Sequence, residues 1–184
     1  DENLGRVLDV MDQYRLWEDT MLIVNTDHGF LLSEHGQWAK CHCPFYEEVA
    51  HIPLFIWDPR TGRQGTRTNC LAQTIDLPAT LLEYFGQPVP PDMEGRSLRP
   101  VLERDQAVRE GGLFGIFGGQ VCCTDGEWVY MRSPLPGNQP RYEYTLMPMR
   151  HGGRRAFINN DVLKSMSLNE PFSFTKEVPV LRLD

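Results

Sequence analysis

The sequence has 184 residues, of which 41% are hydrophobic and 23% are charged. This length and composition are typical of a globular chain with one sizeable core and room for a small appended domain. The net charge of −7 argues against a nucleic-acid backbone as the main partner, and no apolar run is long enough to span a bilayer.

The first predicted element is an amphipathic helix over residues 1–17. Apolar side chains recur there at helical spacing, at Leu4, Val7, Leu8, Met11 and Tyr14. After a short polar turn comes an apolar run, residues 21–24, that ends abruptly at polar residues and a glycine. Such a run is typical of a strand buried on both faces, and a helix, a turn and a buried strand together indicate α/β architecture.

Two further elements are predicted in the first half of the chain. Residues 52–57 indicate a strand, with Pro53 at its start or on an edge because proline has no N–H to donate. A helix should begin at Asp76, a candidate N-cap, and end at Gly86. The buried side of this helix is predicted to consist of Leu81, Leu82 and Phe85. The acidic residues of these segments are expected to cap helices or face solvent: Glu47, Glu48, Asp76 and Glu83.

The remainder of the chain is rich in short β-like runs. Asp125-Gly126 separates two of them, which is typical of a type I′ hairpin. We therefore divide the chain near Gln106. Residues 1–106 are predicted to form one α/β region, and residues 107–184 a small subdomain with an antiparallel hairpin.

Asp27 and His28 are the first candidate site residues, because they directly follow the predicted strand at residues 21–24. Ligands of α/β sheets bind outside the carboxyl ends of such strands. Neighbouring side chains of a strand point to opposite faces, so the pair can meet at one ion only if the chain turns, which Gly29 permits. The pair is either half of a metal site or a capping carboxylate beside an incidental histidine. The polar loop that follows contains His35 and Lys40.

The string at residues 26–29, followed by the string at 34–40, resembles the second signature of the sulfatases, which belong to the alkaline-phosphatase-like superfamily. The likeness continues through residues 46–48, 51–54, 75–82 and 94–98. It implies an α/β fold: the C-terminal half of an alkaline-phosphatase-like sandwich, with a mostly parallel sheet and flanking helices, plus a small antiparallel sheet subdomain.

The resemblance also implies roles for four residues. The matching Asp and Asn/His of sulfatases bind a divalent cation, so Asp27 and His28 are expected to be metal ligands. Ca²⁺ suits the carboxylate, and the imidazole extends the choice to Mn²⁺ or Zn²⁺. Lys40 is assigned to the sulfate or the leaving-group oxygen, as a compact positive charge for an oxyanion. His35 is either a substrate-side donor or proton carrier, or a loop histidine that holds its own turn.

The sequence does not contain the sulfatase segment Cys-x-Pro/Ala-x-Arg, whose Cys or Ser becomes the formylglycine nucleophile. On the family's layout that segment and the remaining metal ligands lie upstream of Asp1. We therefore expect a C-terminal portion of a sulfatase, which as the complete protein hydrolyses a small-molecule or saccharide sulfate ester and alone is inactive. Surface uncovered by the truncation would favour a homo-oligomer. The ester itself and a cytoplasmic or exported localisation stay open.

Two alternatives remain at this point. One is a phosphodiesterase or phosphonate monoester hydrolase of the same superfamily, in which an unmodified Thr or Ser is the nucleophile. The other is a non-catalytic zinc or binding module around Cys41 and Cys43. A CxC spacing with scattered histidines is a weaker zinc signal than a paired C-x2-C, and five cysteines without a CxxC are a poor disulfide framework.

Overall fold

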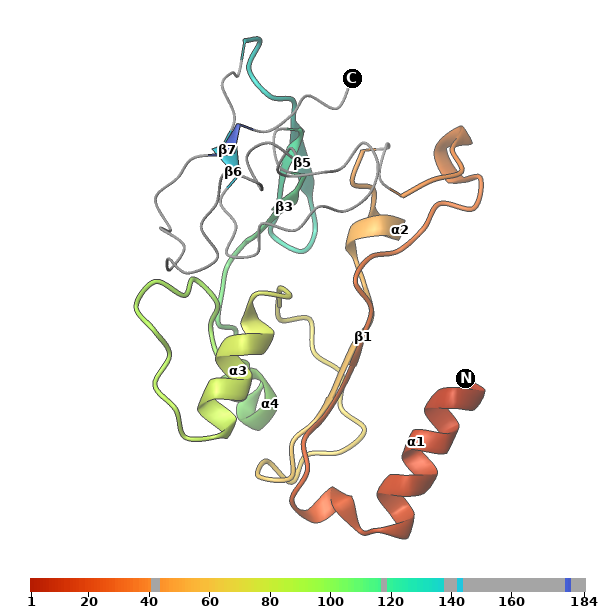
Figure 1. The fold of residues 1–184 in the computed structure, drawn as a ribbon, viewed down its shortest axis with the longest axis vertical. Coiled ribbons are helices and arrows are strands. Elements are labelled where there is room, and N and C mark those ends of the chain that lie inside the picture. Colours follow the sequence, from red (N-terminus) through yellow and green to blue (C-terminus); the bar gives the residue numbers. More distant parts are fainter. Residues whose placement is uncertain (41–43, 117–118, 138–141, 144–177, 180–184) are drawn as a thin grey trace, which may run out of the picture. The chain divides into compact units, whose positions relative to one another are not determined.

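The computed structural model of the protein describes residues 1–40, 44–116, 119–137, 142–143 and 178–179. The chain divides into two compact units, residues 1–133 and residues 134–184. The elements of Figure 1 follow in chain order: α1 (Glu2–Gln13), η1 (Leu16–Glu18), β1 (Leu22–Asn25), η2 (Glu34–Gly36), α2 (Glu47–Ala50), β2 (Leu54–Trp57), α3 (Asp76–Tyr84), α4 (Arg99–Arg104), β3 (Gly112–Gly115), β4 (Val121–Thr124), β5 (Val129–Arg132), β6 (Tyr142–Glu143) and β7 (Val178–Pro179).

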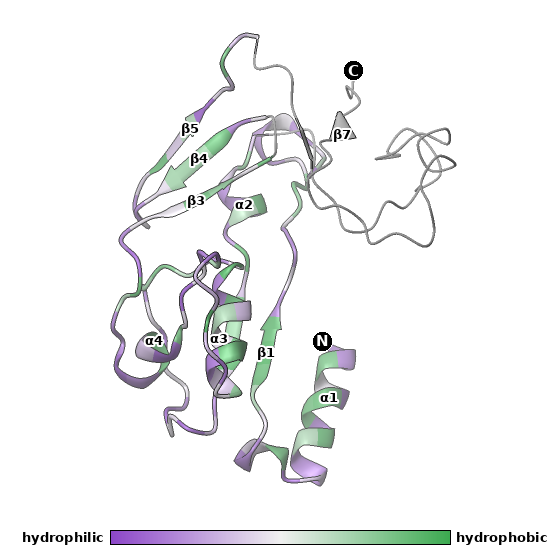
Figure 2. Ribbon diagram, turned by 60° about the vertical axis from the view of Figure 1, so that its left-hand side comes forward, coloured by the Kyte–Doolittle hydropathy of each residue, from purple (hydrophilic) through white to green (hydrophobic). Residues whose placement is uncertain are grey.

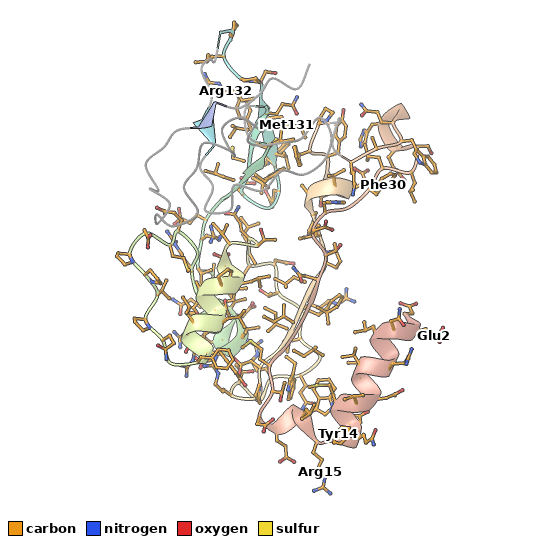
Figure 3. The ribbon with its side chains drawn as sticks, in the orientation of Figure 1. Glu2, Tyr14, Arg15, Phe30, Met131 and Arg132 are labelled. Carbon is orange, nitrogen blue, oxygen red and sulfur yellow. The ribbon has the colours of Figure 1, made fainter. Side chains whose placement is uncertain are left out.

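The helix α1 confirms the predicted amphipathic helix over a slightly shorter range, and Figure 2 shows apolar and polar residues alternating around it. Tyr14 and Arg15 mark its C-terminal end in Figure 3. Arg15 takes a left-handed conformation, φ 57°, and turns the chain into η1. There Trp17 meets Trp57 edge to face, with ring centroids 5.6 Å apart, and Trp57 Nε1 donates to the carbonyl of Trp17 over 3.0 Å. An aromatic contact therefore joins this end of α1 to β2.

The strands β1 and β2 form a two-stranded antiparallel ribbon in which Leu22 lies opposite Trp57 and Asn25 opposite Leu54. The sequence predicted instead that β1 is a central strand of a largely parallel sheet, buried on both faces. In the described part of the chain β1 pairs with β2 alone, and its apolar residues are half-buried. Gly29, which follows β1, donates to the carbonyl of Val49 in α2, which precedes β2. The chain therefore enters β2 at the end of the ribbon where it leaves β1, and the two strands run antiparallel.

The helix α3 begins at Asp76 and ends before Gly86, φ 66°, as predicted. The Asp76 carboxylate, however, is neither a cap of its own helix nor exposed. It is fully buried and accepts hydrogen bonds from the backbone N–H groups of Gln73 and Arg96, each over 2.8 Å. It also forms an ion pair with Arg109, which is itself only 10% exposed. Asp76 therefore ties three separate segments together.

A second buried carboxylate, Asp58, holds the loop after β2. Arg60 Nη2 lies 2.7 Å from Asp58 Oδ2 and 3.0 Å from Glu83 Oε2. Arg99 of α4 also reaches Glu83, over 2.7 Å, so this carboxylate joins α3 to α4 instead of capping a helix or facing solvent as predicted. Burial alone would raise the pKa of Asp58, but the hydrogen bonds and charge of Arg60 hold that pKa below its ordinary value.

The strands β3, β4 and β5 form a three-stranded antiparallel sheet. The predicted hairpin is present, but its loop covers residues 125–128 instead of a two-residue type I′ turn. The Asp125 carboxylate accepts from the backbone N–H groups of Glu127, over 3.0 Å, and Trp128, over 2.8 Å, which stabilises the longer loop.

The sheet belongs to the unit 1–133, so the compact units do not divide at Gln106. The assignment of domains 1–106 and 107–184 stays a prediction. In the unit 134–184, β6 and β7 pair antiparallel. Within the residues that the structure describes, no helix combines the length and apolarity needed to cross a membrane.

Candidate functional site

Gly29 brings the end of β1 directly against α2. Its N–H donates to the carbonyl of Val49 over 2.9 Å, and a Cβ added to Gly29 would lie 1.7 Å from the carbonyl oxygen of Glu48. The sequence suggested that Gly29 permits a turn. Its φ lies outside the left-handed region, so what requires glycine here is the close approach of two backbones.

Three of the predicted site residues converge beyond the carboxyl end of β1. His28 Nε2 lies 3.1 Å from Asp27 Oδ2 and 3.0 Å from Lys40 Nζ. His28 Nδ1 lies 2.9 Å from the carbonyl oxygen of Gly29. A carbonyl can only accept, so Nδ1 carries a proton and donates it. This bond fixes the orientation of the ring and directs Nε2 toward the other two side chains.

The charges around His28 Nε2 oppose one another. Desolvation disfavours the charged form of Asp27, but a hydrogen bond from the backbone N–H of His28 and the charge of its ring lower the pKa of this carboxyl. Metal ligation requires the neutral form of the imidazole. In that form, with the proton on Nδ1, the Nε2 lone pair faces both the Lys40 ammonium and an Asp27 oxygen. The ammonium satisfies that lone pair, whereas the carboxylate faces it as a second acceptor. A cation between the carboxylate and Nε2 would remove this conflict.

The two donor atoms fit part of a metal site. Two ligand atoms at right angles to each other are about 3.3–3.7 Å apart around Ca²⁺ and about 2.8–3.1 Å apart around a smaller ion such as Zn²⁺. Asp27 Oδ2 and His28 Nε2 are 3.1 Å apart. The Asp27 side chain is 80% exposed, so an ion can reach it. In the described part of the chain no group of three or more His, Cys, Asp and Glu side chains could hold a metal. Asp27 and His28 could therefore hold only two of the six to eight ligand positions that Ca²⁺ takes.

His35 lies in a different setting, on η2. Its ring stacks on Tyr46, with centroids 3.8 Å apart and planes at 14°, and its Nε2 lies 3.2 Å from Glu48 Oε2. Figure 3 shows Phe30, at the start of this loop, beside α2. Of the two roles considered for His35, these contacts favour the loop histidine that holds its own turn.

Sequence reasoning treated Glu48 as a capping or solvent-facing residue and did not single out Tyr46. The signal that could have identified them is the string 46–48, because it continues the resemblance directly after the candidate site. Cys41 and Cys43, on which the zinc alternative rests, lie outside the described residues.

The family model described as Sulfatase matches residues 1–87. The chain is 35% identical over 105 residues to the N-acetylglucosamine-6-O-sulfatase of Bacteroides thetaiotaomicron. The aligned residues make up 57% of this chain and 18% of that relative. It is 30% identical over 148 residues to the choline-sulfatase of Rhizobium meliloti, and this alignment covers 76% of this chain and 28% of that relative.

Two solved structures each match 71% of this chain with a TM-score of 0.62 and 26% identity. One is BT4656 in complex with its substrate D-glucosamine-2-N,6-O-disulfate, of which 28% is covered. The other is the phosphonate monoester hydrolase SpPMH from Silicibacter pomeroyi, of which 29% is covered. They confirm the predicted α/β fold class. The chain spans 18% and 28% of the length of the two curated relatives.

Proposed function

Because the chain belongs, through residues 1–87, to the sulfatase family of the alkaline-phosphatase-like superfamily, we propose that the complete protein hydrolyses a sulfuric ester at a divalent cation. In this proposal Asp27 and His28 supply two of the metal ligands, and Lys40 binds an oxygen of the sulfate or of the leaving group. The observation that carries the proposal is the convergence of these three side chains on His28 Nε2.

Each of the three residues has a distinct task. Asp27 contributes a negative charge and oxygen ligands at an exposed position. The Nδ1–H bond to Gly29 orients the His28 ring, so that in the neutral form required of a metal ligand the Nε2 lone pair is directed toward Asp27 and Lys40. A bound divalent cation, with Ca²⁺ favoured and Mn²⁺ or Zn²⁺ as alternatives, would stabilise the negative charge that develops during sulfuryl transfer. Lys40, three ångströms from Nε2, brings its ammonium to the same place for an anionic substrate oxygen.

The nucleophile and the other ligands are proposed to come from outside these 184 residues. The sequence contains no Cys-x-Pro/Ala-x-Arg segment. Two ligands rarely retain Ca²⁺, so this chain alone should bind divalent metal weakly and should not turn over a sulfate ester. The substrate is proposed to be a small-molecule or saccharide sulfate ester, because the matching proteins include an N-acetylglucosamine-6-O-sulfatase and a choline-sulfatase.

Phosphonate monoester hydrolysis is the second candidate. The match to the phosphonate hydrolase SpPMH equals the match to BT4656 in TM-score and in identity. Both chemistries transfer a tetrahedral oxyanion group, which the same lysine and cation can bind. Assay of the complete protein with an aryl sulfate and with an aryl phosphonate monoester separates them, because the preferred ester is the one with the higher kcat/KM.

The site itself is tested first in the chain alone, with Mn²⁺ as a paramagnetic probe in NMR spectra of the histidine rings. We expect Mn²⁺ to broaden the His28 signals at lower concentration than those of His51, and Asp27→Ala to abolish the difference. Asp9→Ala, an exposed acid on α1, is the matched control and should leave the broadening unchanged. Equal broadening of His28 in Asp27→Ala would rule out the ligand role.

The same pair of variants then tests the role of the metal in turnover. In the complete protein Asp27→Ala should lower kcat for the preferred ester by about a hundred- to a thousandfold. Near-normal turnover in that variant would contradict the proposal, whatever the behaviour of the chain alone.

A further inference from the structure

Residues 30–40 form a loop whose base is closed by backbone and core contacts. Leu31 N donates to the carbonyl of Ala39 over 2.9 Å. Leu31 is also fully buried and packs in one cluster with Val49 of α2. Since Ala39 directly precedes Lys40, the closure of this loop determines where the chain presents the Lys40 side chain.

The tip of the loop adopts conformations that L-residues rarely take. Ser33 and His35 have positive φ angles of 98° and 56°, and Gly36 follows with 66°. The turn is closed by Ser33 N, which donates to the carbonyl of Gln37 over 3.0 Å. A non-glycine residue in this region costs free energy, so it persists only where surrounding contacts offset that cost.

His35 supplies such contacts from the tip itself. One face of its ring stacks on Tyr46, and its Nε2 lies 3.2 Å from Glu48 Oε2. Tyr46 and Glu48 flank the start of α2, and the Glu48 carbonyl is packed against Gly29, next to His28. The tip of the loop and the end of β1 are thus held by the same short helix.

We infer that His35 is a positioning residue, which pins the 30–40 loop to α2 through Tyr46 and Glu48 and so holds Lys40 against His28. The consequence for the reaction rests on the function proposed above for Lys40. The positioning itself does not, because it concerns only where the ammonium lies. In this arrangement His35 does not exchange a proton with the substrate. Its ring is engaged by two protein groups, and it acts through the loop.

The test uses NMR on the chain alone with His35→Asn, because asparagine tolerates a positive φ and removes only the ring. Two signals are followed: amide exchange of Ser33, which reports the tip, and the ¹⁵N shift of His28 Nε2, which reports the hydrogen bond from Lys40. Lys40→Met gives the shift of His28 without that bond. We expect His35→Asn to speed Ser33 exchange about three- to tenfold and to move the His28 shift toward the Lys40→Met value.

His51→Asn is the matched control. It breaks a similar pair, between His51 and Glu47, that lies on α2 and does not reach the loop, so both signals should stay at their original values. Glu48→Gln is the second variant. It keeps the hydrogen-bonding shape and removes the charge, and it should change both signals in the same direction as His35→Asn, by less.

Faster Ser33 exchange with an unchanged His28 shift would overturn the inference, because His35 would then hold only its own turn. No change in either signal would overturn it as well. If Lys40→Met retains full ester hydrolysis in the complete protein while both NMR effects appear, the positioning stands and the proposed role of Lys40 fails.

Discussion

In α1 the apolar side chains Leu4, Val7 and Val10 are 38%, 47% and 45% exposed, whereas the carboxylates of Asp58 and Asp76 are at most 2% exposed. The usual distribution of apolar and charged groups is thus inverted between these two parts of one unit. The segment 58–109 closes on itself, since each buried acid has an arginine and backbone donors supplied from within it. In α1, among the described residues, most of the apolar face stays accessible.

The segment 58–109 and the helix α1 differ in what stabilises them. Asp76 and Asp58 connect segments far apart in the sequence, so the region 58–109 depends on complete pairing of a few buried charges. The helix α1 has a well-formed amphipathic pattern and buries mainly Met11, so its stability depends on whatever covers its apolar face. The following changes test this distinction, from the largest expected effect on stability to the smallest.

Asp76→Ala should strongly destabilise the region 58–109. It leaves the Arg109 guanidinium, 10% exposed, without its carboxylate, and the backbone N–H groups of Gln73 and Arg96 without an acceptor. We expect the free energy of unfolding to fall by about 3–5 kcal/mol, measured by urea titration. Asp9→Ala, the same change on exposed α1, should alter it by less than about 0.5 kcal/mol. Equal effects of the two variants would refute the contrast.

Acid should weaken the same region through Asp58. Its pKa is lowered in the folded chain, so the unfolded chain binds the proton more readily. The stabilisation is therefore complete above the ordinary value of 3.8 and is lost as pH falls toward the folded value. Asp58→Asn should cost about 2 kcal/mol at neutral pH and flatten the fall of unfolding free energy between about pH 5 and 3. Parallel pH curves for the two proteins would show that Asp58 does not contribute to the acid response.

Val7→Lys on α1 should change association far more than stability. We propose that the uncovered face of α1 takes part in a homo-oligomer, because Asn3, Arg6, Val7 and Val10 line a shallow, mainly apolar depression. Sedimentation velocity should show a concentration-dependent dimer that Val7→Lys converts to monomer, with unfolding changed by less than about 0.5 kcal/mol. Gln13→Lys adds the same charge elsewhere on α1 and should leave the dimer intact. A compact monomer at all concentrations for the original chain would remove the proposal.

Local patterns were enough to predict several elements. The apolar periodicity of α1, the stop of α3 at Gly86 and the start of β2 after Pro53 all depend on neighbours within a few residues. The convergence of Asp27 with His28 and Lys40 was also expected, because the resemblance covers the strand and loop that bring them together.

Contacts between distant segments could not be predicted in this way. The partner of Asp76 is Arg109, 33 residues further along the chain, so the local sequence predicts a helix cap where the structure has a buried ion pair. The antiparallel direction of β2 depends on the contact between Gly29 and Val49, which are 20 residues apart. The buried face of α3 was also predicted wrongly, because its buried members include Ala79 and Thr80.

Predicted members of that α3 face are instead exposed: Leu81 by 40% and Phe85 by 70%. Burial of Thr80 costs little because its hydroxyl is satisfied in both roles. It accepts from the backbone N–H of Leu98 over 3.0 Å and donates to the carbonyl of Asp76 over 2.7 Å. Hydrophobicity alone ranks threonine below leucine, so such a polar link between α3 and the segment before α4 has no signal in the apolar pattern.

The edge-to-face pair of Trp17 and Trp57 attaches η1, and with it the C-terminal end of α1, to β2. Toward the other end of α1, Leu4 and Val7 are exposed. Trp57 is followed directly by Asp58, whose carboxylate holds Arg60. The contact that attaches this end of α1 to β2 therefore lies one residue before the carboxylate that anchors the segment 58–109, so the open and the closed parts of the unit are joined at neighbouring residues.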